Sequence, residues 1–149
     1  MHYGDEIVFD AQAKNAPPKD GEEQGHTYLF ALIQVRKEGH YRSFLVDGVH
    51  PGDAPLQALR EAITALGGVL SVRSDETYQL DDPEGDDKLP GLFAFLAWPA
   101  DRPVIEAHDL LSRAAEPWPH PLVWPGIVQE LGFEEEMGRQ AELIERYGL

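Results

Sequence analysis

Cysteine is absent from all 149 residues of this chain. Without thiols the chain has no disulfide framework, thiolate zinc site, iron–sulfur cluster or cysteine nucleophile. The chain also lacks the run of about 18 apolar residues that a membrane-spanning helix needs. Its first six residues, Met1-His2-Tyr3-Gly4-Asp5-Glu6, show neither the basic nor the apolar region of a signal peptide. We therefore expect a cytoplasmic protein that does not enter membranes.

Positive charge is scarce, with 12 Lys and Arg against 27 Asp and Glu, a formal net charge of −15. Because binding to a phosphate backbone depends on clustered Lys and Arg, we expect no direct nucleic-acid binding. Residues 1–75 hold 11 acids and 7 bases, whereas residues 76–149 hold 16 acids and 5 bases. Residues 75–87 alone contain seven acids and neither Lys nor Arg. The acidity is therefore concentrated in the second half.

The length and a hydrophobic fraction of 42% fit a single domain over residues 1–149. Residues 11–26 contain Pro17-Pro18 and hardly any large apolar residue, which predicts a mobile linker or loop. The remaining segments predict an α+β fold, in which a mixed or antiparallel sheet of about five strands packs with three to four helices. The expected order is β-β-α-β-β-β-α-α-α, with a further edge strand near residues 5–10.

Short apolar runs locate the expected strands. Residues 27–36 predict a buried strand that forms a hairpin with residues 41–46. Residues 69–73 and 77–80 predict a second strand pair. Residues 91–98 are apolar on both faces and predict a central strand.

Helical spacing and capping signals locate the helices. Gly52-Asp53-Ala54-Pro55 predicts a helix start, and Gly67-Gly68 predicts its end. Further helices are expected over residues 105–115, 127–131 and 134–147. In the last of these, an apolar stripe is expected to face the core; it consists of Phe133, Met137, Ala141 and Ile144.

A loop that ends in Gly52-Asp53 leads into the first expected helix, which carries Arg60-Glu61 and is followed by Gly67, and this pattern resembles the Nudix box. Gly52-Asp53 corresponds to the Gly-Glu of that motif, Arg60-Glu61 to its Arg-Glu pair, and Gly67 to its closing glycine. Thr64 and Ala65 stand where the family has a Glu-Glu pair. The resemblance implies a Nudix-like domain, catalytically degenerate, that binds or hydrolyses a nucleotide-type ligand with Mg²⁺.

Residues 81–87 contain five carboxylates, which are the ligands that hard cations prefer. An EF-hand register that starts at Asp82 places Asp87 where glycine is required and Phe93 where glutamate is required. The histidines show no His-Glu-x-x-His spacing, and no nucleophile motif or phosphate-binding loop is found. We therefore expect no metal site, no cofactor and no catalytic residue.

Two features predict binding to another protein. Concentrated acidic charge steers association with a basic partner. Residues 117–125 contain four prolines and two tryptophans, which predicts an extended segment, and exposed tryptophan in such a segment is a frequent apolar anchor. The expected function is that of a non-enzymatic acidic interaction protein of the inhibitor, immunity or decoy type, with a basic protein as partner; the Nudix-like domain is the alternative. The expected partner-binding residues are Asp81, Asp82, Glu84, Asp86, Asp87, Trp118 and Trp124.

Overall fold

The computed structural model describes residues 3–16 and 27–149, with only the backbone of residues 35–37. The chain divides into two compact units, Met1–His40 and Tyr41–Leu149, called here the N-terminal and C-terminal units. The described residues form seven strands, all in antiparallel sheets, and four helices. The predicted α+β class is confirmed, and the order of elements follows the expected one, with one short strand added between the second and third helices.

The N-terminal unit contains a two-stranded antiparallel sheet of β1 (Glu6–Ala13) and β2 (Phe30–Lys37). Residues 11–13 belong to β1, so the expected linker over 11–26 starts too early. The part of that linker at residues 17–26 lies outside the described residues.

Strand β2 corrects the prediction for residues 27–36 in two respects. It pairs with β1 and forms no hairpin with the strand that follows it. It is also not buried, because Leu32 is 49% exposed and Ile33 is 65% exposed. The buried hydrophobic side chains of the described residues all lie at position 44 or later. Apolar β-branched residues identify a strand but do not indicate which layer, if any, covers it.

The C-terminal unit is built on a sheet with the order β4-β6-β3-β7, to which β5 adds by pairing with β6. The longest ladder joins β3 to β6, from Tyr41 opposite Pro99 to Val49 opposite Gly91. The strands are β3 (Tyr41–Val49), β4 (Val69–Val72), β5 (Gln79–Asp81), β6 (Lys88–Pro99) and β7 (Leu122–Val123).

The central position predicted for residues 91–98 is confirmed in β6. The predicted pairing of residues 69–73 with residues 77–80 is wrong, because β4 and β5 each pair with β6. Strand β7, within the proline-rich segment, was not predicted. It approaches β3 at Gly48, where a Cβ would lie 2.4 Å from the Pro121 carbonyl oxygen.

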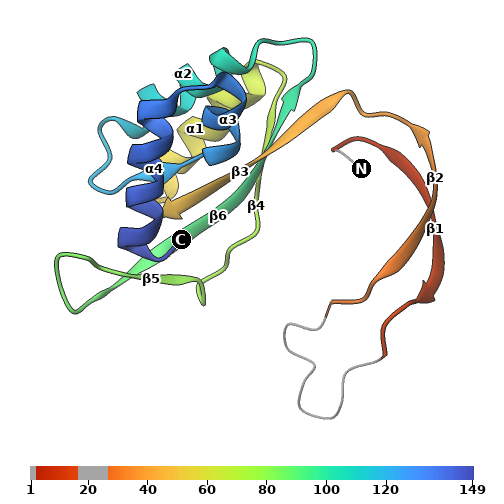
Figure 1. Cartoon of the computed structure of the whole chain (residues 1–149), viewed down its shortest axis with the longest axis horizontal. Coiled ribbons are helices and arrows are strands. Elements are labelled where there is room, and N and C mark those ends of the chain that lie inside the picture. Colours follow the sequence, from red (N-terminus) through yellow and green to blue (C-terminus); the bar gives the residue numbers. More distant parts are fainter. Residues whose placement is uncertain (1–2, 17–26) are drawn as a thin grey trace. The chain divides into compact units, whose positions relative to one another are not determined.

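The helices lie on one side of this sheet (Figure 1). They are α1 (Asp53–Ala65), α2 (Val104–Ala115), α3 (Pro125–Leu131) and α4 (Glu134–Tyr147). The core between the layers includes Ile63 of α1, Trp98 of β6, Leu111 of α2 and Ile127 of α3, which are almost fully buried. None of the helices in residues 3–16 and 27–149 has the length and apolar content needed to cross a membrane.

We expect residues 41–149 to fold when residues 1–40 are removed, because the buried hydrophobic side chains of the described chain lie within the C-terminal unit. Urea unfolding of the shortened chain, followed by tryptophan fluorescence, should show one cooperative transition. All three tryptophans lie in this unit. A broad transition or none would contradict the independence of the unit.

Candidate partner-binding surface

The acidic segment of residues 81–87 forms the end of the hairpin between β5 and β6. Its backbone closes on itself, because the Asp82 N–H donates to the Asp87 carbonyl at 3.1 Å and the Gly85 N–H to the Asp82 carbonyl at 3.3 Å. The Asp82 side chain accepts a hydrogen bond from the Glu84 N–H at 2.9 Å. Of the carboxylates predicted to bind a partner, Asp82 is half-buried. The exposed ones are Asp81, Glu84, Asp86 and Asp87.

Two of these carboxylates have cationic partners. Lys88 pairs with Asp81 within the hairpin. Arg146, at the end of α4, lies 3.1 Å from the Glu84 carboxylate. Exposed pairs of this kind contribute less than about 1 kcal/mol to stability. The second pair nevertheless shows that the end of α4 lies against the tip of the hairpin.

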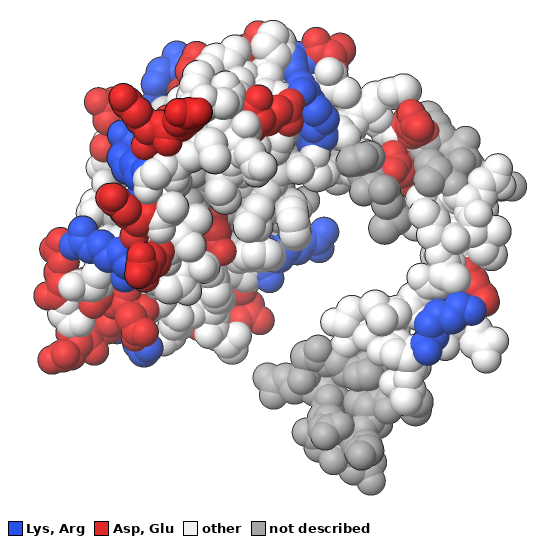
Figure 2. Space-filling view, in the orientation of Figure 1, with Lys and Arg blue, Asp and Glu red and all other residues white. Residues whose placement is uncertain are grey.

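Helix α4 brings further carboxylates to the same side of the C-terminal unit. We call the combined set the acidic surface. Figure 2 shows carboxylates gathered at the lower left, where Figure 1 places the β5–β6 hairpin and the end of α4. The basic residues within it are Lys88, Arg139 and Arg146. We assign to it the exposed or half-buried acids of the two elements, which are Asp81, Asp82, Glu84, Asp86 and Asp87 of the hairpin and Glu134, Glu135, Glu142 and Glu145 of α4.

A chain of polar contacts holds α4 in place. The backbone N–H of buried Trp124 donates to Gln140 Oε1 at 2.9 Å. Gln140 Nε2 donates to Glu136 Oε1 at 3.2 Å, and Glu136 Oε2 lies 2.9 Å from His108 Nε2. Gln140 and His108 are both buried. The chain therefore links α4 to α2 and to the residue that precedes α3.

Burial raises the pKa of Glu136, but hydrogen bonds from His108 and Gln140 and the charges of His108 and Arg139 lower it. The net effect is a pKa below the ordinary value of 4.5. Glu136 is therefore a carboxylate at neutral pH, and its negative charge stabilises the folded chain.

The prediction that the apolar stripe of α4 faces the core is wrong. Phe133 is 37% exposed and Met137 is 40% exposed, whereas the buried residues of α4 are Gln140 and Tyr147. The helix is oriented so that Gln140 and Glu136 reach the donors on the neighbouring elements, because a buried donor without an acceptor is costly. In the sequence, the inward face of α4 is marked by the spacing of four residues between Glu136 and Gln140, which allows their side chains to form a hydrogen bond.

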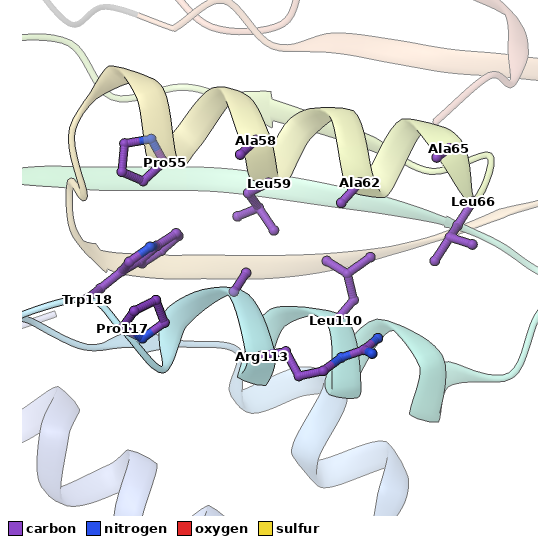
Figure 3. Close-up of a pocket in the computed structure, with 11 residues that line it drawn as sticks. Pro55, Ala58, Leu59, Ala62, Ala65, Leu66, Leu110, Arg113, Pro117 and Trp118 are labelled. Carbon is purple, nitrogen blue, oxygen red and sulfur yellow. The ribbon is translucent and has the colours of Figure 1, made fainter.

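Trp118 lies at one end of an apolar groove between α1 and α2 (Figure 3). The groove has a volume of about 940 Å³. Leu59 and Leu110 face each other across it, and Arg113 is the one charged residue among those that line it. The segment of Trp118 also approaches α4, since the His120 ring lies 6.3 Å from the ring of Tyr147.

Trp124 does not match its predicted role as an exposed anchor. It is 4% exposed, and its side chain belongs to the core cluster of the C-terminal unit. Its backbone N–H is the donor to Gln140, which ties this position to α4. The proline content of residues 117–125 predicted extension but could not show that one tryptophan turns inward.

A buried carboxylate at Asp47 was not predicted as a site residue. Its Oδ1 accepts hydrogen bonds from the Tyr78 hydroxyl and the Gly48 N–H, both at 2.8 Å. Burial raises the pKa of Asp47, although both hydrogen bonds lower it. Burial and the nearby Asp47 raise the pKa of Tyr78 to about 12. The Tyr78 ring lies over Gly91, where a Cβ would be 2.4 Å from it.

The residues of the Nudix resemblance do not converge on a metal site. Glu61 is exposed on α1, where its carboxylate accepts a hydrogen bond from Gln57 at 3.0 Å. Asp53 is exposed at the start of the same helix. Across the described part of the chain, no three His, Asp or Glu side chains come together in a way that would hold a metal ion.

Glu136→Gln should destabilise the fold. At pH 7 we expect the free energy of unfolding to fall by about 1–3 kcal/mol, because the buried hydrogen-bond chain loses its charged member. Since the pKa of Glu136 is lowered from 4.5, this stabilisation is present above pH 4.5 and is lost as the pH falls through the folded-state value. Urea unfolding at several pH values measures it.

Glu135→Gln is the matched control, because Glu135 is an exposed neighbour on α4. Its free energy of unfolding should stay close to that of the unmodified chain. Equal effects of the two substitutions would show that the buried contacts of Glu136 do not hold α4.

Asp47→Asn should have the opposite pH dependence. The amide keeps an oxygen acceptor for Tyr78 and Gly48 but removes the buried charge. Because the pKa of Asp47 is raised from 3.8, its favourable contribution is present below pH 3.8 and is lost as the pH rises through the folded-state value. The variant should therefore gain stability relative to the unmodified chain as the pH rises. A difference that does not change with pH in urea unfolding would contradict this assignment.

Comparison of the chain with protein-family models, with curated proteins and with solved structures finds no match.

Proposed function

We propose that this chain is a non-enzymatic interaction protein, of the inhibitor, immunity or decoy type, that binds a basic protein through its acidic surface. One observation carries the proposal. Carboxylates from two segments far apart in the sequence, the β5–β6 hairpin and α4, lie on one surface, and the Arg146–Glu84 pair joins them at 3.1 Å.

The charge balance of this surface supports the choice of partner. Nine exposed or half-buried carboxylates are accompanied by three basic residues, Lys88, Arg139 and Arg146. A surface potential of one sign raises the rate at which an oppositely charged protein arrives, and salt screens the effect. Binding should therefore weaken as the ionic strength rises.

A fixed helix also supports the proposal. The polar chain from Trp124 to His108 immobilises α4 before any partner binds. Binding then does not have to order this helix, which lowers the entropic cost of association.

Trp118, at the end of the groove between α1 and α2, is a secondary apolar contact for the partner in this proposal. Trp124 is not among the partner-binding residues, because it is buried. The proposal keeps the cytoplasm as the place of action and excludes nucleic acid as a direct partner, since the surface repels phosphate.

A capture experiment tests the proposal with two matched triple variants. One neutralises acids of the acidic surface (Asp86→Asn, Glu142→Gln, Glu145→Gln). The other neutralises three exposed acids outside it (Asp53→Asn, Glu61→Gln, Asp101→Asn). The immobilised chains are exposed to a soluble extract of the source organism at low and high salt, and the retained proteins are identified.

We expect the unmodified chain and the second variant to retain a basic protein at low salt and release it at high salt. The first variant should bind that protein about threefold to a hundredfold more weakly, because each of the three neutralised charges contributes about 0.2–1 kcal/mol. Equal retention by both variants would refute the proposal. So would retention of no basic protein together with Mg²⁺-dependent turnover of nucleoside diphosphate compounds.

A further inference from the structure

Helix α4 and its N-cap residue Phe133 carry an exposed apolar stripe, formed by Phe133, Met137 and Ala141. These residues are four apart, so they lie along one side of the helix. Phe133 and Met137 are 37% and 40% exposed, and Ala141 is exposed as well. Large apolar side chains aligned on an exposed helix face are typical of a surface that another molecule covers.

Carboxylates border this stripe. Glu134 lies three residues before Met137 and Glu145 four residues after Ala141, spacings that place both beside the stripe on the exposed side. At the start of α4, a hollow of about 460 Å³ is lined by Phe133, Glu135 and their neighbours from 132 to 136. An aromatic face beside carboxylates suits the aliphatic stem and the cationic head of a lysine or arginine.

We propose that the exposed apolar stripe of α4 is the anchor for a basic amphipathic helix of the protein partner. The apolar side chains of that helix cover Phe133, Met137 and Ala141, and its Lys and Arg residues lie against Glu134, Glu145 and the hollow. This inference rests on the proposed function and names the segment that the acidic surface recognises.

Charge complementarity favours this site over the groove between α1 and α2, and a basic helix over two other occupants, a second copy of the chain and an anionic lipid surface. The groove beside Trp118 is also apolar, but its one charged lining residue is Arg113, so it offers no carboxylate to the Lys and Arg of a basic segment. A second copy of this chain, with a net charge of −15, would bring further negative charge to the stripe. Lipid headgroups of negative charge are disfavoured by the same carboxylates. A basic segment satisfies both the apolar and the charged parts of the surface.

Three synthetic peptides test the inference on the full chain: an amphipathic helix of leucine and lysine, a scrambled peptide of the same composition, and oligolysine. We expect the amphipathic peptide to bind about tenfold more tightly than the scrambled one. Met137→Gln and Phe133→Ala should each weaken that binding by about threefold to tenfold, and should leave oligolysine binding unchanged.

Phe95→Ala is the matched control for Phe133→Ala, because Phe95 is also an exposed phenylalanine, 42% exposed, and lies on β6. It should leave all three affinities unchanged. Circular dichroism of each variant shows whether it is folded, and Met137→Gln keeps a good helix former at an exposed position.

The outcomes separate this inference from the proposed function. If oligolysine binds but the amphipathic peptide binds no more tightly than the scrambled one, the inference is overturned and the acidic surface stands. The same holds if Met137→Gln has no more effect than Phe95→Ala. If no peptide binds the unmodified chain, the proposed function fails as well. Self-association of the unmodified chain that Met137→Gln abolishes, measured by sedimentation, would overturn the inference in favour of a second copy.

Discussion

The hydrogen-bond chain from the Trp124 N–H through Gln140 and Glu136 to His108 determines how α4 is presented. Its members are largely buried, and together they join α4 to α2 and to the start of α3. Buried polar groups must find partners, so this chain selects one rotation of the helix around its axis. That rotation places Gln140 inward and leaves Met137 outward.

Two consequences for the surface follow from this rotation. The exposed glutamates near the end of α4 lie on the same side as the hairpin carboxylates (Figure 2), with Arg146 against Glu84. Phe133 and Met137 are instead exposed among those glutamates. Charge brings a basic partner close, whereas apolar contact gives the complex its lifetime and selectivity. One structural cause thus produces both parts of the proposed binding surface.

The sequence predicted correctly those elements whose start, end or burial depends on residues close by along the chain. Helix α1 begins at Asp53 and ends before Gly67, as the local start and stop signals predicted, although its N-cap is Gly52 and no side chain caps it. The central position of β6 followed from its apolar character on both faces. Predictions that depended on distant partners failed. The pairing of β2 with β1, the burial of Trp124 and the inward face of α4 all depend on contacts that composition and periodicity do not encode. The acidic hairpin was visible as a run of carboxylates, but its contact with α4 was not.

Amide chemical-shift mapping on the isotopically labelled chain tests the central claim most directly. The chain is titrated with the amphipathic leucine–lysine peptide at low salt. The account predicts shifts that cluster at residues 81–88 and 133–146 and shrink when salt is added. Shifts centred instead on the groove between α1 and α2, around Leu59 and Trp118, or on β1 and β2, would contradict it.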